Sequence, residues 1–125
     1  MSRPRITSPM VLLADENHDQ HVLCSAYFPT VALVLLHAYT PEQCLALVRA
    51  ARPAVIILHA RRQGVFTPSF LGDLEEIGFE VAQRLIILTA DGGLCELPGL
   101  RRRVAECIVK PCSVVELAEW VHELS

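Results

Sequence analysis

Five short runs of apolar residues alternate with segments of helical spacing along this chain, and this alternation limits the fold more than any other feature. Runs so short and so apolar are typical of strands that are buried on both faces of a sheet. The expected strands are Met10–Ala14, Val31–Leu36, Val55–Leu58, Leu85–Leu88 and Cys107–Val109. Because strands that alternate with helices pair in parallel through right-handed crossovers, the pattern predicts an α/β fold with helices on both faces of a parallel sheet.

The segments between these runs carry helix signals of different strength. Thr40 is a good N-cap before Pro41, and Ser113 with Glu116 has the spacing of a capping box. Glycine and proline weaken the segment 91–103, where only a short helix is expected. The expected helices cover 17–28, a segment that opens at Thr40, 69–79, part of 91–103, and 113–124.

Length and composition favour one folded domain. The chain has 125 residues, of which we expect 1–8 to be a flexible tail and 9–125 to be the domain. An apolar content of 52% excludes a disordered chain, and a net charge of −3 argues against nucleic acid as a partner. Residues 21–41 lack charged side chains, but Pro29, Thr30 and His37 interrupt the stretch, so we predict a strand there and no membrane span.

The five cysteines form no C-x-x-C pair, and the apolar stretch after Arg3 and Arg5 is too short for a signal peptide. Reduced, mostly buried thiols in a cytoplasmic protein are therefore expected.

Polar residues follow four of the five predicted strands directly. Asp15 and Glu16 come after the first strand, His59 after the third, Thr89 after the fourth, and Lys110, the only lysine of the chain, after the fifth. In an open α/β sheet the carboxyl ends of the strands form the edge where ligands bind. These five residues are therefore the candidate site.

The segments that carry these residues resemble the four signature segments of receiver domains from bacterial response regulators. They are Leu12–Glu16, Pro53–His59, Ile87–Ala90 and Val109–Pro111, and their order matches over essentially the whole chain. The resemblance implies a flavodoxin-like, doubly wound sheet of five parallel strands in the order 2-1-3-4-5. It also implies a signal-transduction module of a two-component system or phosphorelay.

In that family an acidic pair helps to hold Mg²⁺, and an aspartate after the third strand accepts a phosphoryl group. By this resemblance Asp15 and Glu16 match the acidic pair, Thr89 the hydroxyl that binds the phosphoryl group, and Lys110 the lysine that pairs with it. Two positions depart from the family pattern. His59 stands in place of the phosphate-accepting aspartate, and Cys107 in place of the switch Tyr or Phe.

An imidazole cannot form an acyl phosphate, and Mg²⁺ prefers oxygen ligands. We therefore expect a degenerate phosphorylation site without a catalytic residue or a bound cofactor, in which Mg²⁺ binds weakly or not at all. His59 is expected to fill the site, hydrogen-bonded to Thr89 or to the backbone; a phosphohistidine, or a transition-metal ligand with Asp15 and Glu16, is the alternative. Lys110 is expected to neutralise the acidic pair, with help from Arg61 or Arg62.

A partner surface is expected on the face that the fourth helical segment, the fifth strand and the last helix form, since related receivers use this face for dimers and partners. Its candidate residues are Arg101, Arg102, Arg103 and Trp120. A solvated helix end is the plainer interpretation of the three arginines, and the helical spacing places Trp120 beside the buried stripe.

Two functions follow from these residues. The first is a phosphorylation-independent signalling module that acts by protein–protein interaction, alone or as the regulatory domain of a longer chain. The alternative is a ligand- or redox-sensing switch that uses the vacated pocket, or Cys107 and Cys112 near it. An enzyme is not expected, because the sequence has neither a G-x-S-x-G elbow nor a glycine-rich phosphate loop.

Overall fold

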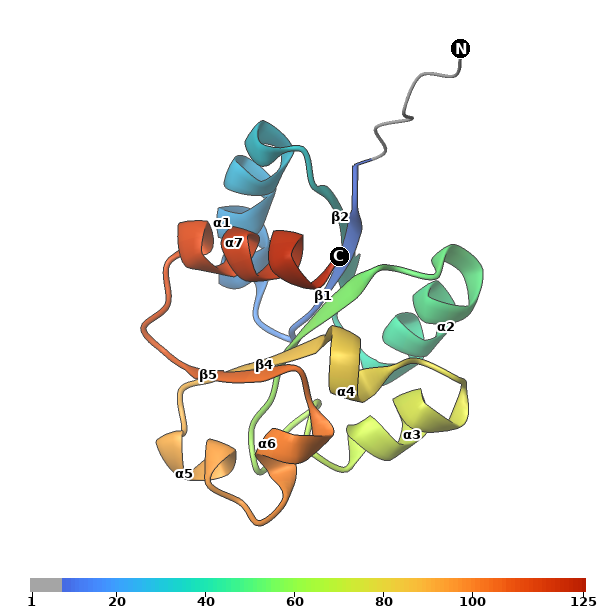
Figure 1. The fold of residues 1–125 in the computed structure, drawn as a ribbon, viewed down its shortest axis with the longest axis vertical. Helices are drawn as coiled ribbons and strands as arrows, with labels where there is room; N and C mark the ends of the chain where they lie inside the picture. The colour runs from blue at the N-terminus through green and yellow to red at the C-terminus, as the bar shows by residue number, and fades with distance from the viewer. Residues whose placement is uncertain (1–7) are drawn as a thin grey trace.

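The computed structural model describes residues 8–125, so all but the last residue of the expected tail 1–8 lies outside the described residues. Five parallel strands form one sheet in the order β2-β1-β3-β4-β5 (Figure 1). The strands are β1 (Met10–Ala14), β2 (Val34–Ala38), β3 (Val55–His59), β4 (Leu85–Thr89) and β5 (Glu106–Val109). This arrangement confirms the predicted fold class and strand order.

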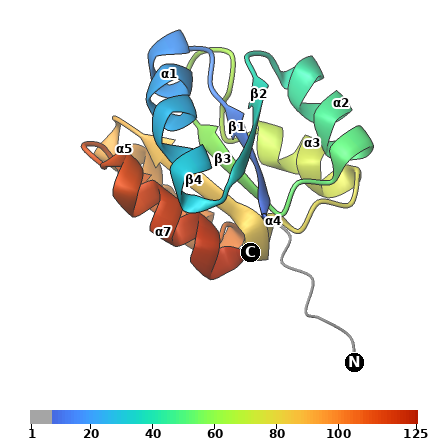
Figure 2. The ribbon, with the colours of Figure 1, turned by 90° about the horizontal axis from the view of Figure 1, so that it is seen from above.

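Helices cover both faces of the sheet (Figure 2). The 3-10 turn η1 (Phe28–Val31) and two helices, α1 (His18–Tyr27) and α7 (Val114–Leu124), lie on one face. The other face carries α2 (Pro41–Ala51), α3 (Phe70–Glu76), α4 (Val81–Arg84), α5 (Gly92–Cys95) and α6 (Leu100–Arg103). Within residues 8–125, no helix is both long enough and apolar enough to cross a bilayer.

Alternate residues of each central strand enter different cores. Leu12 and Ile56 pack under α2 and α3, whereas Leu13 and Ile57 pack under α1 and α7, and all four are fully buried. Since a fully buried Leu or Ile stabilises a fold by roughly 1.5–3 kcal/mol, the two cores hold the strand ends rigidly in place. This rigidity is what positions the candidate site at the carboxyl edge.

The helix starts follow the local sequence. Thr40 Oγ1 accepts a hydrogen bond from the Gln43 N–H at 3.2 Å, and Gln43 Oε1 accepts one from the Tyr39 N–H at 2.7 Å. At α7, Ser113 Oγ accepts from the Glu116 N–H at 3.1 Å. Both predicted N-caps are therefore formed.

Two predicted elements have different bounds. The second strand begins at Val34 and not at Val31, because Phe28–Val31 form a 3-10 turn that closes on a left-handed Ala32. The third helix ends at Glu76, because Gly78 takes a φ of +88° and turns the chain into α4, which the sequence did not predict. The weak segment 91–103 forms the two short helices α5 and α6.

The expectation that all cysteines are reduced is wrong for one pair. Cys95 of α5 and Cys107 of β5 form a disulfide, with their Cα atoms 5.8 Å apart. Twelve positions separate the two residues along the chain, and only the fold lays α5 against β5. Cys24 and Cys44 are buried free thiols, and Cys112 is a half-buried free thiol.

Candidate functional site

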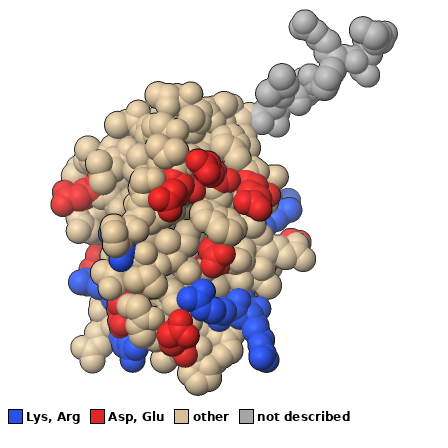
Figure 3. All heavy atoms as spheres, turned by 60° about the vertical axis from the view of Figure 1, so that its left-hand side comes forward, with Lys and Arg blue, Asp and Glu red and all other residues tan. Residues whose placement is uncertain are grey.

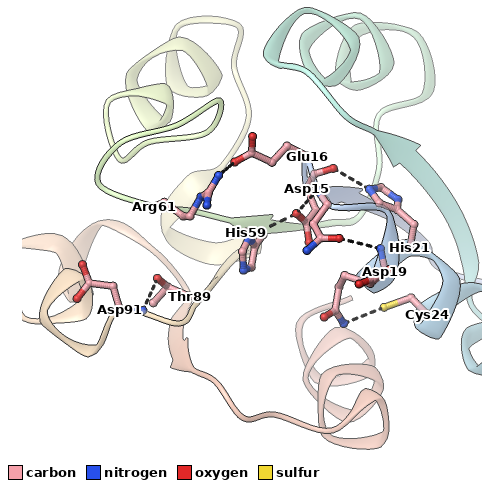
Figure 4. A network of polar contacts seen from close by, with 11 residues as sticks. Asp15, Glu16, Asp19, His21, Cys24, His59, Arg61, Thr89 and Asp91 are labelled. Atoms are coloured by element: carbon pink, nitrogen blue, oxygen red, sulfur yellow. Dashed lines mark hydrogen bonds and ion pairs between the residues drawn. The ribbon is translucent and has the colours of Figure 1, made fainter.

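The carboxyl edge of the sheet brings the five candidate residues together. Asp15 directly follows β1, and His59 and Thr89 are the last residues of the neighbouring strands β3 and β4. Lys110 follows β5, and its backbone N–H donates to the Thr89 carbonyl at 2.7 Å. Figure 4 shows Asp15, Glu16, His59 and Thr89 converging from three separate strand ends.

Asp15 and His59 form the buried centre of this site. The Asp15 side chain is fully buried, the His59 side chain is 10% exposed, and Asp15 Oδ1 lies 3.4 Å from His59 Nδ1. Asp15 Oδ1 accepts a hydrogen bond from the Asn17 N–H at 2.8 Å. Among residues 8–125, Asp15 Oδ2 and both ring nitrogens of His59 find no hydrogen-bond partner. Each unsatisfied buried polar atom costs about 1–3 kcal/mol, so these three atoms lower the stability of the fold.

The expected hydrogen bond from His59 to Thr89 or to the backbone is not formed in the described structure. Thr89 Oγ1 instead accepts from the Asp91 N–H at 3.1 Å, which turns this hydroxyl toward the loop after β4 (Figure 4). The reason is positional, because both side chains leave the ends of adjacent parallel strands and the Asp91 backbone turns back over Thr89.

Burial lowers the pKa of His59, and this effect outweighs the Asp15 carboxylate, which acts in the opposite direction. The positive charges of Lys110 and Arg61 lower the pKa of His59 further. An imidazole has an ordinary pKa of about 6.5, so His59 is neutral near physiological pH.

Arg61, rather than Lys110, neutralises Glu16. The Arg61 guanidinium forms an ion pair with Glu16 Oε1 (Figure 4). Lys110 forms no ion pair with any described residue. The loop passes close to this pair at Gly64, where a φ of +146° and a Cβ position 3.2 Å from Glu16 Oε1 favour glycine. The expectation that Lys110 would neutralise the acidic pair is therefore wrong for Glu16, because Arg61, from the loop after β3, forms the ion pair with it.

Arg62, the neighbour of Arg61, binds a different acid. Its Nε lies 2.6 Å from Asp91 Oδ2, and this hydrogen bond lowers the pKa of the Asp91 carboxyl. The two arginines of the loop after β3 thus hold two acids that frame the edge of the site.

Two histidines lie behind Asp15, and the sequence analysis missed both. His21 Nε2 lies 2.8 Å from the Asp15 carbonyl, and His21 Nδ1 lies 2.8 Å from His37 Nδ1. A carbonyl only accepts, so His21 donates through Nε2, and the contact between the two Nδ1 atoms joins His21 to His37. The hydrogen bond from His21 holds the backbone of Asp15. Burial lowers the pKa of His37, and His21 and His18 lower it further.

No signal in the sequence joins His21 to His37, because one lies in a helix and the other near the end of a strand whose bounds were predicted too early. The same holds for Arg61 with Glu16, where the sequence indicated only that an arginine of the loop could assist.

The side chains at this edge fit Mg²⁺ poorly. A receiver-type magnesium site needs several oxygen ligands, but His59 brings an imidazole and Glu16 is held by a guanidinium. Among residues 8–125, no group of three or more His, Cys, Asp or Glu side chains is arranged to hold a metal ion. Among the buried side-chain oxygens of residues 8–125, only Asp15 Oδ2 has no hydrogen-bond partner.

The switch position and the expected partner face lie beside this edge. Cys107 is tied to Cys95, so its sulfur is fixed between α5 and β5. Arg101 pairs with Glu96 and Glu106, and Arg103 pairs with Glu75, so these arginines are partly neutralised. Arg102 is exposed and forms no ion pair with a described residue.

Trp120 is half-buried against the α1–α7 core and lies among three glutamates of α7. These are Glu116, Glu119 and Glu123. Figure 3 shows a band of acidic side chains across the molecule, with acidic and basic side chains mixed below it.

No protein-family model and no curated protein sequence matches the chain. Solved structures do match over nearly its whole length. The receiver domain of the Francisella response regulator 1452 is 24% identical, with a TM-score of 0.76, over 93% of this chain and 95% of that one. The chemotaxis response regulator CheY4 of Vibrio cholerae is 19% identical, with a TM-score of 0.75, over 95% and 100%.

Two further matches are a response regulator solved with a bound ligand and a longer protein that is covered only in part. The response regulator TrrA from Thermotoga maritima, solved in complex with Mg²⁺-BeF, is 19% identical with a TM-score of 0.77, over 94% of this chain and 99% of that one. NtrX from Brucella abortus is 16% identical with a TM-score of 0.78, over 94% of this chain but only 27% of that one. These likenesses establish the receiver-like fold.

Proposed function

We propose that this protein is a phosphorylation-independent, receiver-like signalling module of the cytoplasm that acts by binding another protein and is not an enzyme. The observation that carries the proposal is the buried His59–Asp15 pair at the edge where receiver domains are phosphorylated. NtrX, in which the matching part is a fraction of a longer chain, supports a role as the regulatory domain of a larger protein.

Phosphoryl transfer needs an acceptor oxygen, a cation and fixed donors that offset the charge on the transferred oxygens. A neutral imidazole takes the place of the acceptor, and Arg61 occupies Glu16. The Thr89 hydroxyl is bound by the Asp91 N–H. Each group that phosphoryl transfer would need is thus either replaced by an imidazole or already bound to another residue. This favours a protein that stays in one conformation and is not switched by phosphorylation.

The test is the intact mass of the protein after incubation with Mg²⁺ and acetyl phosphate, compared between the wild type and His59→Asp. We expect no added phosphoryl group on the wild type and one on the variant, because the variant regains an acceptor carboxylate beside Asp15. His59→Asn is the matched control, since it changes the same position without supplying a carboxylate. A phosphoryl group on the wild type would overturn the proposal, and peptide mapping would show whether His59 carries it.

The binding surface under this proposal is the face of α6, β5 and α7. β5 is the edge strand of the sheet, and Val109 on it is 40% exposed. Arg102 on α6 is free to pair with an acid on a partner, and Trp120 offers aromatic area on α7. A second copy of this chain would fit, since its acidic α7 could meet the basic α6.

A redox-sensing switch is the second candidate, and the Cys95–Cys107 disulfide favours it. A peroxide or an oxidised small thiol would take two electrons and two protons from the two thiols and leave the disulfide. The bond ties α5 to the strand that carries the switch position, so its reduction would free α5 beside the partner face. Under this candidate, partner binding differs between the disulfide and dithiol forms.

A further inference from the structure

A hollow of about 400 Å³ lies at the amino edge of the sheet, at the opposite end of the strands from the candidate site. Its lining residues come from the end of α2 and from the turn that joins α3 to α4. Figure 1 shows both segments on the right of the view. Arg49 and Arg52 line it from α2 and its C-cap, and Arg84 lines it from α4. The volume falls within the range of small-molecule sites.

The charge around this hollow is positive and mostly unpaired. Among residues 8–125, neither Arg49 nor Arg52 forms an ion pair, and the single acid in the lining, Glu80, lies 3.6 Å from the Nε of Arg84. Both members of that pair are about half exposed, and such surface pairs are worth about 1 kcal/mol at most, so a ligand can replace Glu80. The carboxyl end of α2 contributes about half of a negative charge, which leaves the hollow positive.

Part of the wall is apolar, beside the charged side chains. Ile77 and Phe79 are half-buried and pack against the core, and Val48 is 6% exposed. A guanidinium binds a carboxylate or a phosphate through two parallel hydrogen bonds, and its planar fork loses little freedom when it does. Arginines above an aromatic wall therefore suit a ligand with an oxyanion at one end and an apolar body at the other.

The backbone fixes where the Arg52 side chain starts. Arg52 has a φ of +50°, in the left-handed region, and its N–H donates to the Val48 carbonyl at 3.1 Å as the cap of α2. The three arginines thus start from a helix turn, a capping residue and a second helix, so they approach the hollow from separate directions.

We propose that this hollow binds a small organic anion that carries a phosphate or a carboxylate on an aromatic or aliphatic body. The site is independent of the carboxyl-edge site and of the partner face, because no residue belongs to two of them. Bound ligand would bridge α2 to the α3–α4 turn and hold these elements together.

The test is a titration of the ¹⁵N-labelled protein followed by its backbone amide signals, with four probes used separately. Phenyl phosphate and benzoate carry both features, inorganic phosphate carries only the charge, and benzyl alcohol only the ring. We expect saturable shifts at Arg52, Gly78 and Phe79, with phenyl phosphate or benzoate binding about tenfold more tightly than the other two probes. Whichever of phenyl phosphate and benzoate has the lower Kd shows whether the site prefers phosphates or carboxylates.

The double variant Arg49→Gln with Arg52→Gln should weaken the tighter of these two probes about tenfold or more, since charge-assisted hydrogen bonds are worth about 1.5–3 kcal/mol. Arg102→Gln is the matched control, because it removes an exposed, unpaired arginine elsewhere and should leave binding unchanged. Unchanged amide signals away from the hollow show that the variants fold. Shifts that do not saturate, equal binding of inorganic phosphate, or equal loss in Arg102→Gln would overturn the proposal.

Discussion

His59 places a group that is neutral when buried where a receiver domain has a negative one. The Asp15 carboxylate is too weak an influence to keep the imidazole protonated, because burial dominates its pKa. The loss of one negative charge from the site removes repulsion between carboxylates, which in receivers a metal ion offsets. Under the proposed function, a histidine at this position gives up phosphoryl transfer, and the site then needs no cation.

The pH dependence of stability tests this view of His59. Its folded pKa is lower than its unfolded value of about 6.5, so the unfolded chain binds more protons in that range and the free energy of unfolding falls as pH decreases from about 7 to about 5. His59→Asn should make this fall less steep in urea denaturation. Part of the slope should remain, because burial lowers the pKa of His37 as well.

Gln63→Asn is the control for this experiment, because it changes an exposed side chain of the loop after β3 that carries no titratable group, so the slope should stay as in the wild type. If His59→Asn has the same slope as the wild type, His59 does not titrate as its burial requires.

At the scale of elements, α5 has only four residues and two of them are glycines, so it has little helical stability of its own. The disulfide to Cys107 attaches this weak turn to the edge strand. Within α5, Leu94 and Cys95 are buried, whereas Gly92 and Gly93 are exposed. The order of the segment therefore depends on the disulfide more than on local helix propensity.

Reduction should destabilise the protein by about 3 kcal/mol, since the disulfide closes a loop between residues that are twelve positions apart. The measurement is urea denaturation with and without dithiothreitol. Cys107→Ser should show the lower stability in both conditions, whereas Cys112→Ser, which removes a free thiol, should respond to the reductant as the wild type does.

Alkylation in denaturant without reductant counts the thiols independently, and three of the five should react: Cys24, Cys44 and Cys112. Denaturant is needed because burial raises the pKa of Cys44 to about 12 and suppresses its thiolate in the folded protein. Five reactive thiols in protein purified without reductant would exclude the disulfide.

At the scale of the whole molecule, the face of α6, β5 and α7 has an acidic cluster on α7 and, among the described residues, one unpaired arginine, Arg102, on α6. Acidic residues surround Trp120 on α7, and three arginines follow one another on α6, on the two sides of an edge strand. A two-fold dimer would place unlike parts of the two copies against each other.

Sedimentation velocity should show self-association that increases with protein concentration and weakens with salt, because the contacts are between exposed charges. Arg102→Glu and Trp120→Ala should each weaken it, whereas Arg49→Gln on the far edge should not. If the protein is a monomer at every concentration and salt level, a second copy is not the partner of this face, and a different protein is.

The sequence alone determined the fold class, because short apolar runs and helical spacing are local patterns that follow from which side chains avoid water. It also placed Asp15, His59, Thr89 and Lys110 at one edge, since the carboxyl ends of parallel strands must meet there. The caps at Thr40 and Ser113 were predictable for the same reason, as each depends on neighbours within one turn.

Only the tertiary structure decided which partners these residues take. Arg61 rather than Lys110 binds Glu16, Cys95 meets Cys107, and His21 meets His37. In the amino-edge hollow, Arg84 of α4 likewise meets Arg49 and Arg52 from the end of α2. Such pairs join residues far apart in the chain, and their distances depend on how the elements pack, whereas periodicity reports only which face of an element is buried.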